Sequence, residues 1–432
     1  MKKALKRIAL FVVLTPVVLV VLAAVGYFSY RLVAVGGEST PHQAYLAKYK
    51  EEITPAQDPA FSIFDSAFYQ NQIFFLGEAH GTAKPQELDF ALVKHLNQKV
   101  NMRYYLAEVD YSQAHYLNQY LLTGDEKNLD VVFQFWARLN AQWGNQDFMN
   151  KIKKIRAYNQ ILPEAQRVSI MGVDRIQDPE ALHRHLKELV ATLPASQNPL
   201  QNSLRLLTSS DSLDTDALTS LAKQLITKDS ASLGFELRHT LQNAVYYTDR
   251  TKRDSVMYLN LNTLVQSKGL QKEKFYGMWG MFHAIPVQVE RGTPFAYLLQ
   301  HASSPFKNKA VSIGVYTLDS ESMMPTATMP SFVSKGQRFV NTTMSNNDGP
   351  LVFVNGIKDL RAVTKENSMT LFKTNAPGTP YKNSERLASF KVLMPNQSIA
   401  FKQANTGLAD VFQYICLVRN SRATTPVELK QL

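Results

Sequence analysis

The middle of the sequence alternates short apolar runs with longer segments of helical periodicity. Apolar runs at 71–77 and 103–110 flank the segment 85–100, whose apolar residues recur at helical spacing, and a third run covers 167–174. Such alternation predicts βαβ units, because parallel strands need a long crossover connection between them. We therefore predict an α/β fold with a mainly parallel central sheet flanked by helices.

A wholly helical pattern interrupts these strands from about residue 179 to residue 268. We predict that this segment is a helical insertion in the α/β fold. Within it, one long helix is expected to run from Phe235 through Arg253 to Leu264.

The second half of the chain returns to strands. Three strand-like runs are found at 273–286, 309–318 and 409–419. A variable region at about 325–403 is rich in Ser, Asn, Thr and Gly, which predicts loops and a small edge element. We expect the α/β domain to span 61–432, after a tether with a short helix at 33–60.

The N-terminal segment is the most apolar part of the chain. Residues 8–30 carry no charge, and a helix of this length crosses the roughly 30 Å hydrocarbon core of a bilayer. The basic residues that precede it are Lys2, Lys3, Lys6 and Arg7. By the positive-inside rule, residues 1–32 are predicted to form a cytoplasmic tip and a single transmembrane anchor.

This orientation predicts an inner (cytoplasmic) membrane protein whose globular domain lies on the periplasmic or extracellular side. The alternative is a cleaved signal peptide. Against it, the apolar run exceeds the roughly 7–15 residues of a signal-peptide core, and no clear small-x-small cleavage site closes it.

Charge and cysteine content exclude some classes of function. The net charge is +11, but the basic residues are mostly scattered singly, so we do not predict nucleic-acid binding. Cys416 is the only cysteine, which excludes an intramolecular disulfide. It lies in an apolar run, where we interpret it as a buried small hydrophobic residue.

Polar residues follow each predicted parallel strand. Functional groups collect beyond the carboxyl ends of parallel strands, because the loops that leave those ends converge there. We therefore predict a site for a small-molecule substrate or ligand at this edge of the sheet. The residues at these strand ends are Glu78, His80, Glu108, Asp110, Asp174, Arg175 and His283.

Both histidines follow a glycine at the same spacing, in Gly77-x-x-His80 and Gly280-x-x-His283. Glycine allows tight turns and a close approach to a ligand. A histidine held by a carboxylate such as Glu78 is a suitable general base for activating water. The structural alternatives are hydrogen-bonded histidines without a catalytic role.

Glu108 has two interpretations, and so does the pair Arg250 and Arg253. Glu108 could act with His80, or it could cap the following helix together with Asp110. Arg250 and Arg253 are three residues apart, so in one helix they would share a face. An arginine on that face could stabilise an oxyanion, although a solvated helix face is equally compatible with the sequence.

The same histidines and carboxylates are also acceptable ligands for zinc or another divalent metal. The sequence contains no H-E-x-x-H motif, no cysteine pair and no G-x-S-x-G motif. We therefore assign no metal ligand and favour attack by water, with or without a metal, over a serine nucleophile.

Several segments together resemble the erythromycin esterase family. They are LGEAHGTAKPQELDFALVKHL, RYYLAEVDYSQAHYLNQYLLTGD, FQFWARLNAQW, IRAYNQ, SIMGVD, KRDSVMYLNL, GMFHAIP and ADVFQYICLVRNSRATTP. The resemblance extends from about Gln72 to Pro426, and the variable region is unmatched. It implies hydrolysis of an ester or lactone by activated water. It places the active site on Glu78, His80, Glu108, Arg253 and His283, and we assign Asp174 and Trp143 to substrate binding.

One departure from that family leaves other functions open. A single residue separates Glu78 from His80, where the macrolide esterases have two. This form is similar to the haem-binding ChaN lipoproteins, which implies a ligand-binding protein without turnover. The paired G-x-x-H motifs are similar to the TraB and Tiki relatives, which implies a metallopeptidase. A membrane-anchored hydrolase is the favoured hypothesis, with a divalent metal or haem as possible cofactors.

Overall fold

The computed structural model describes residues 2–194, 198–228, 233–301, 303–327, 329, 334, 336–394 and 397–430, with the side chains of the first helix described from Thr15 onward. The strands are β1 (Lys50–Ile53), β2 (Ile73–Glu78), β3 (Tyr104–Asp110), β4 (Ser169–Asp174), β5 (Phe275–Gly280), β6 (Ala310–Leu318), β7 (Ser322–Pro325), β8 (Phe339–Thr342), β9 (Val352–Val354), β10 (Met369–Lys373), β11 (Phe390–Val392) and β12 (Tyr414–Arg419).

The helices are α1 (Lys2–Val35), α2 (Thr40–Lys48), α3 (Ser66–Gln70), α4 (Lys84–Val100), α5 (Tyr111–Thr123), α6 (Lys127–Arg138), α7 (Gln146–Gln160), α8 (Pro179–Ala191), α9 (Pro199–Ser209), α10 (Thr215–Lys228), α11 (Phe235–Thr248), α12 (Arg253–Ser267), α13 (Phe295–His301), α15 (Ile357–Ala362) and α16 (Leu408–Val411). Short 3-10 turns are η1 (Pro55–Gln57), η2 (Glu164–Gln166) and η3 (Met281–Ala284).

The central sheet has the strand order β1-β10-β12-β6-β2-β5-β3-β4 among the described residues. The six strands from β12 to β4 pair in parallel, whereas β10 and β1 are antiparallel at one edge. This confirms the predicted α/β class with a mainly parallel sheet. Parallel strands place their carboxyl ends at one edge, so β2, β3, β4 and β5 deliver their following residues to one place.

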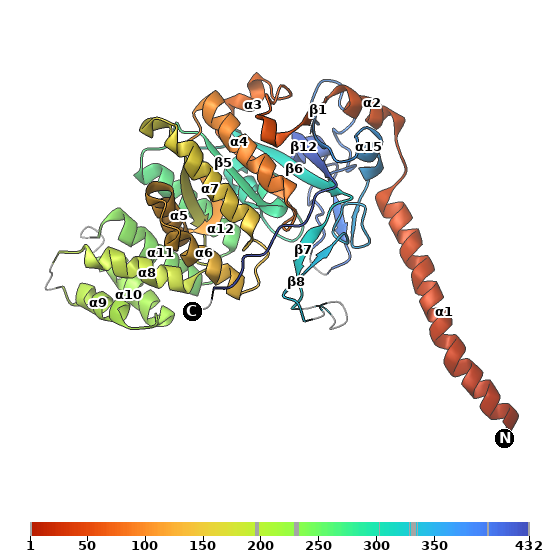
Figure 1. The fold of residues 1–432 in the computed structure, drawn as a ribbon, viewed down its shortest axis with the longest axis horizontal. Helices are drawn as coiled ribbons and strands as arrows, with labels where there is room; N and C mark the ends of the chain where they lie inside the picture. Colours follow the sequence, from red (N-terminus) through yellow and green to blue (C-terminus); the bar gives the residue numbers. More distant parts are fainter. Residues whose placement is uncertain are drawn as a thin grey trace.

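Helices cover both faces of the sheet (Figure 1). In β2, Phe74 and Leu76 belong to a core cluster with residues of α4, α5, α6 and α7, whereas Ile73 and Phe75 belong to another cluster with residues of α12 and α13. Successive side chains of a strand point to opposite faces, so a strand that is covered on both sides is apolar throughout. This explains why the parallel strands read as continuous apolar runs.

The predicted helical insertion contains α8, α9, α10, α11 and α12. Figure 1 shows the first four grouped at one end of the globular part, and they have a leucine-rich core of their own. The single long helix predicted from Phe235 to Leu264 is wrong. The chain leaves the helix at Asp249 and turns at Arg250, whose φ of 52° is left-handed, before α12 starts at Arg253. The eight residues 248–255 (TDRTKRDS) include neither glycine nor proline, so no helix-breaking residue marked the turn in the sequence.

Some segments differ from their predicted roles because of long-range pairing. Residues 50–53, which we assigned to the tether, form β1 and pair with β10. The variable region supplies β10 to the central sheet as well as the small β11–β9 pair. The last predicted strand is shorter than expected, since 408–411 form α16. Pairing of strands far apart in sequence leaves no local periodicity to detect.

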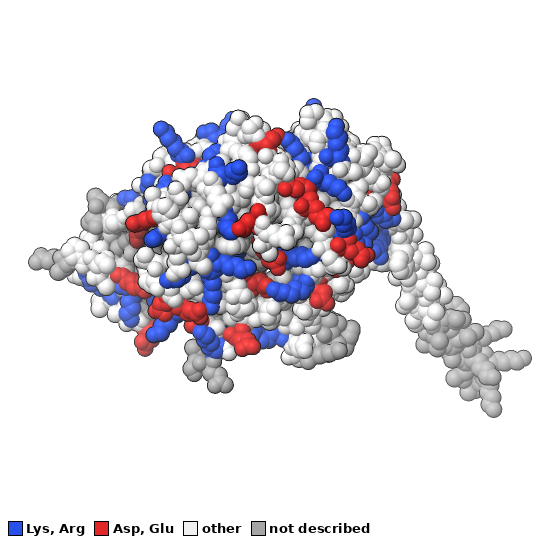
Figure 2. Space-filling view, turned by 45° about the horizontal axis from the view of Figure 1, so that its top comes forward, with Lys and Arg blue, Asp and Glu red and all other residues white. Residues whose placement is uncertain are grey.

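α1 projects from the globular part (Figure 1), and its described surface in Figure 2 is free of charged side chains over most of its length. Residues Thr15–Val35 are long and apolar enough to cross a membrane by length and composition, a test that a signal sequence also passes. The basic side chains of Lys2, Lys3, Lys6 and Arg7 lie outside the described residues. At its other end α1 contacts the domain, where the Tyr27 hydroxyl donates to the Pro350 carbonyl (3.0 Å).

Candidate active site

The loop after β2 is held in a fixed shape. Gly81 has a φ of +100°, which favours glycine, and a Cβ there would lie 2.3 Å from Gln142 Nε2. The His80 carbonyl accepts hydrogen bonds from Gln142 Nε2 (2.7 Å) and Ser322 Oγ (3.0 Å). These contacts fix the backbone of His80, so its ring has a defined direction.

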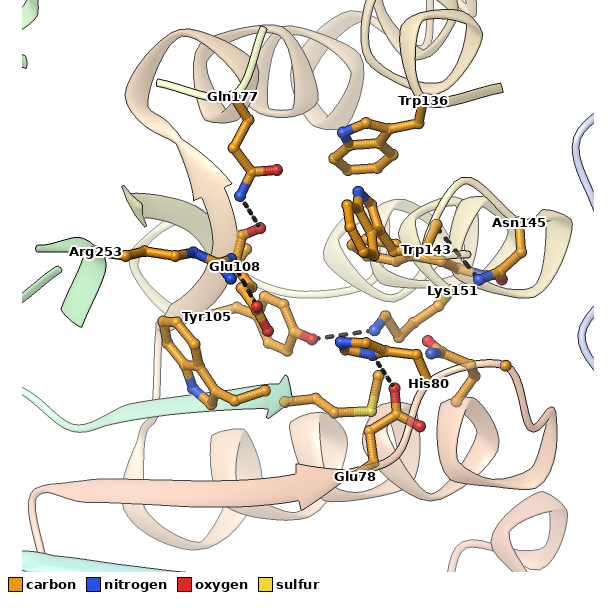
Figure 3. Close-up of a pocket in the computed structure, with 16 residues that line it drawn as sticks. Glu78, His80, Tyr105, Glu108, Trp136, Trp143, Asn145, Lys151, Gln177 and Arg253 are labelled. Atoms are coloured by element: carbon orange, nitrogen blue, oxygen red, sulfur yellow. Dashed lines mark hydrogen bonds and ion pairs between the residues drawn. The ribbon is translucent and has the colours of Figure 1, made fainter. Parts of the chain in front are cut away.

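His80 pairs with the carboxylate at the end of β2. Glu78 is buried, and its Oε1 lies 2.9 Å from His80 Nδ1 (Figure 3). Burial disfavours the imidazolium, but the hydrogen bond and charge of Glu78 and the charge of Glu108 outweigh it, so the pKa of His80 is raised. Burial also raises the pKa of Glu78. With Nδ1 held by Glu78, Nε2 is the nitrogen available for chemistry.

Glu108 lies between the two predicted histidines. Its Oε2 accepts a hydrogen bond from the Gly280 amide (2.8 Å), and its Oε1 lies 3.5 Å from His283 Nε2. Burial opposes ionisation of Glu108, but the charges of His283, Arg253 and His80 outweigh it and lower its pKa to about 2. The alternative in which Glu108 caps the following helix does not hold, because Asp110 supplies that cap to Gln113.

Gly280 is the point around which these groups meet. A Cβ on Gly280 would lie 3.2 Å from His80 Nε2, 3.6 Å from His283 Cδ2 and 3.7 Å from Glu108 Oε2. Glycine therefore keeps the space between the two rings and the carboxylate open. In the sequence, the spacing Gly280-x-x-His283 was the pattern that pointed to this glycine.

Arg253 is the first residue of α12 and reaches the same cluster. Its Nη2 donates to Glu108 Oε1 (2.7 Å) and to Asp174 Oδ2 (2.5 Å), and Nε lies 3.0 Å from both oxygens of Asp174. Asp174, predicted to bind substrate, is fully buried behind Arg253. Asp174 is therefore placed to hold the guanidinium group of Arg253. Arg250 lies in the turn before α12, so the two arginines do not share a helix face.

His283 is held by a carboxylate that sequence reasoning did not single out as its partner. The predicted strand 273–286 ends at Gly280, and His283 lies in the following turn η3. Its Nδ1 lies 2.8 Å from Asp254 Oδ1, and its Nε2 lies 3.4 Å from Arg253 Nη1. Burial opposes the charged form, but Glu108 and Asp254 outweigh it and raise the pKa of His283.

A small cavity of about 50 Å³ opens in front of His80 (Figure 3). Glu78, His80, Glu108, Arg253 and the predicted Trp143 line it. The predicted His283 and Asp174 do not line it, and they contact the lining residues Glu108 and Arg253 instead. The Trp143 side chain is 40% exposed and meets the His80 ring edge to face at 5.9 Å.

Lys151 lines the same cavity, and sequence reasoning missed it. Its ammonium is buried, forms an ion pair with buried Asp89 and lies 3.1 Å from the Tyr105 hydroxyl. That hydroxyl also donates to Asp89 Oδ2 (2.7 Å). Asp89 and Lys151 are 62 positions apart on α4 and α7, so no local pattern linked them. The available sequence signal was that Asp89 and Lys151 each lie on the apolar face of their helix.

The site does not fit a metal ion. Among the described residues, no group of three or more histidine, cysteine, aspartate or glutamate side chains is placed to hold one. Potential ligand atoms are already engaged, since Glu78 holds His80 Nδ1, Arg253 holds Glu108, and Asp254 holds His283 Nδ1.

The cavity in front of His80 is by itself too small to enclose haem. Its volume of about 50 Å³ is well below the roughly 300–1,000 Å³ of pockets that enclose larger ligands.

Cys416 is fully buried in β12, and burial raises the pKa of its thiol, as expected for a packing residue.

Comparison with solved structures identifies proteins of the same fold. A Bacillus cereus protein aligns with a TM-score of 0.67 and 13% identity over 91% of this chain and 100% of its own. A succinoglycan biosynthesis protein gives a TM-score of 0.66 and 13% identity with the same coverage. A mutant of erythromycin esterase EreC, in its open conformation, gives a TM-score of 0.52 and 16% identity over 84% of this chain and 93% of its own.

These likenesses show that the chain shares its α/β fold with these three structures. A search with family models found no match, and neither did a search of curated proteins.

Proposed function

We propose that this protein is a membrane-anchored hydrolase that cleaves an ester or related bond with water activated at His80. The observation that carries the proposal is the arrangement of two histidines, each held through Nδ1 by its own carboxylate, on either side of Gly280 and Glu108. This arrangement suits general acid and base catalysis in which His80 lines the cavity and His283 contacts Glu108 and Arg253, two residues that line it. The fold that the chain shares with EreC is consistent with it.

In this mechanism His80 is the general base. Its Nδ1–H donates to Glu78, so Nε2 carries the lone pair that accepts a proton from water. The water oxygen then forms a bond to the carbonyl carbon of the ester. Glu78 holds the ring in this tautomer and stabilises the imidazolium that forms.

His283 is the general acid. Its raised pKa favours the imidazolium, and its Nε2 points toward Glu108 and Arg253. When the bond between carbon and leaving oxygen breaks, Nε2–H donates its proton to that oxygen. Arg253, held by Asp174 and Glu108, provides positive charge for the oxyanion of the tetrahedral intermediate.

The N-terminal helix supplies the membrane anchor in this proposal. Thr15–Val35 has the length and composition of a span, and the basic residues before it favour a cytoplasmic N-terminus. The site would then face the periplasmic or extracellular side. That location would give it substrates outside the cytoplasm.

Purification of the full chain in detergent allows a direct test. Aryl and alkyl esters are assayed with and without chelator, beside peptide substrates. We expect ester cleavage that resists chelator and falls about 10²–10⁴-fold in His80→Ala and His283→Ala. His301→Ala, which changes an exposed histidine on α13, is the matched control and should keep full activity. Absence of turnover in the wild type, or full activity in His80→Ala, would refute the proposal.

A further inference from the structure

A larger groove adjoins the catalytic cavity. Its volume is about 710 Å³, and the two hollows share four lining residues, which are Trp136, Trp143, Gln177 and Arg253. The groove has the size of a pocket for a small organic molecule, whereas the catalytic cavity has room for only the reacting group. A substrate that reacts at His80 would therefore extend into the groove.

The groove has both polar and apolar walls, and aromatic and aliphatic side chains form the apolar part. Phe135 and Leu139 contribute from the end of α6, and Tyr247 contributes from α11 in the helical insertion. The side chains of Leu139, Trp143 and Tyr247 are exposed, although large apolar side chains are usually buried. Exposed aromatic and aliphatic surface in a concave site provides contact area for an apolar ligand body.

The charged residues of the groove are mainly cationic. Arg175 and Arg250 line it, and both are exposed. Their guanidinium groups have no ion pair or hydrogen bond with any other described part of the chain. Asp216 is the carboxylate on the groove wall, and Arg253 is already neutralised by Glu108 and Asp174. Two unpaired arginines against one carboxylate leave a net positive charge for a ligand.

The backbone of Arg250 adds a second observation. This residue has a left-handed φ of 52°, a conformation that glycine and asparagine adopt at lower cost. The turn it occupies ends α11 and leads directly into Arg253 at the start of α12. A left-handed residue is common directly after a helix, and this helix end fixes Arg250 at the point where the groove meets the catalytic cluster.

We propose that the groove binds the unreactive part of the substrate, and that this part is an apolar body carrying an anionic group. The anion, which can be a carboxylate, phosphate or sulfate, would lie at Arg175 and Arg250, while the ester reaches His80. Arginine suits these oxyanions because its planar group donates two parallel hydrogen bonds. The inference rests on the proposed hydrolase function and names its substrate class.

Matched esters with and without a terminal carboxylate test whether the protein prefers anionic substrates in turnover. Mono-4-nitrophenyl esters of adipate, suberate and sebacate are compared with 4-nitrophenyl hexanoate, octanoate and decanoate, which have equal chain length but no terminal carboxylate. We expect at least one diacid ester to exceed its neutral partner about tenfold in kcat/KM, the gain of a charged hydrogen bond. The double variant Arg175→Gln/Arg250→Gln should remove most of this ratio. Arg184→Gln, an exposed arginine on α8 outside the groove, should retain it.

Binding provides a readout that does not need turnover. Suberanilic acid and octananilide are amides of the same length, and calorimetry measures their Kd for the full chain in detergent. We expect tighter binding of the acid, weakened about tenfold in the double variant but not in Arg184→Gln. If esters are not cleaved but the acid still binds through both arginines, the hydrolase proposal fails and the groove assignment stands. Equal binding of acid and neutral amide, or an unchanged preference in the double variant, would overturn the groove assignment.

Discussion

The Glu78 carboxylate lies 2.9 Å from His80 Nδ1, and one residue separates the two in the chain. Glu78 is the last residue of β2 and is buried, and the following loop contains Gly81, whose φ of 100° is left-handed. Both members of the pair thus come from one strand end, and Gln142 and Ser322 hold the backbone of His80 in place. The Glu78 carboxylate fixes which histidine nitrogen faces the cavity and raises the histidine pKa.

Glu78→Gln should change the pH dependence of activity. The pKa of His80 is above the ordinary 6.5, and a protonated His80 cannot accept a proton from water. Activity should therefore fall as the pH drops through this raised pKa. In Glu78→Gln the pKa of His80 falls, so the acidic limb should shift to lower pH while kcat drops roughly 10²-fold. Profiles of kcat between pH 5 and pH 9 measure both effects, and an unshifted limb would contradict the assigned pair.

Glu108 should contribute to stability only above acidic pH. Its pKa is about 2 in the fold and 4.5 as a reference value, so its stabilising effect is complete above pH 4.5 and is lost as the pH falls toward 2. The shift corresponds to a contribution of about 3 kcal/mol. Denaturant unfolding at several pH values should show a steeper acid loss for wild type than for Glu108→Gln. Parallel curves would argue against the contacts with Arg253 and His283.

Gly280→Ala should inactivate the protein while leaving it folded. The added Cβ would lie 3.2 Å from His80 Nε2, closer than most van der Waals contacts, and would displace the ring. A displacement of about 1 Å in a catalytic group can lower the rate about 100-fold. Gly234→Ala is the control, because a Cβ added at Gly234 would have no other atom within 4 Å. Circular dichroism and kcat/KM measurements separate the effect on the site from the effect on the fold.

Lys151→Met should destabilise the protein. Lys151 and Asp89 form a buried ion pair, and removal of one partner leaves the other charge uncompensated. Such single changes typically cost about 3–5 kcal/mol, whereas replacement of both partners costs much less. The double variant Lys151→Met/Asp89→Asn should therefore recover most of the free energy of unfolding. If the single and double variants are equally unstable, the two charges are not coupled.

The N-terminal helix should keep the protein in the membrane. A transmembrane helix resists alkaline washing, because about 20 apolar residues remain in the bilayer core. Expression of the full chain in bacteria, followed by alkaline extraction and N-terminal sequencing of the pelleted protein, tests this. We expect an intact N-terminus in the pellet. A soluble protein that starts after residue 30 would identify the segment as a cleaved signal sequence instead.

Local patterns in the sequence determined the α/β class, the parallel strands and the position of the polar strand ends. Glu78, His80 and Glu108 could be located because each follows or ends a short apolar strand, and the rule for parallel sheets then brings them to one edge. His283 followed from the same rule and from its glycine. These features depend on residues close together in the chain, which periodicity and spacing report directly.

Only the tertiary structure decided which partners these residues have. Asp254 holds His283 from a different element, and Lys151 meets Asp89 across two helices. The turn at Arg250 and the pairing of β10 with β12 also depend on contacts between distant segments. The physical reason is that burial and ion pairing are set by packing in three dimensions. Residues that are about 30 or 60 positions apart share no periodicity that would link them beforehand.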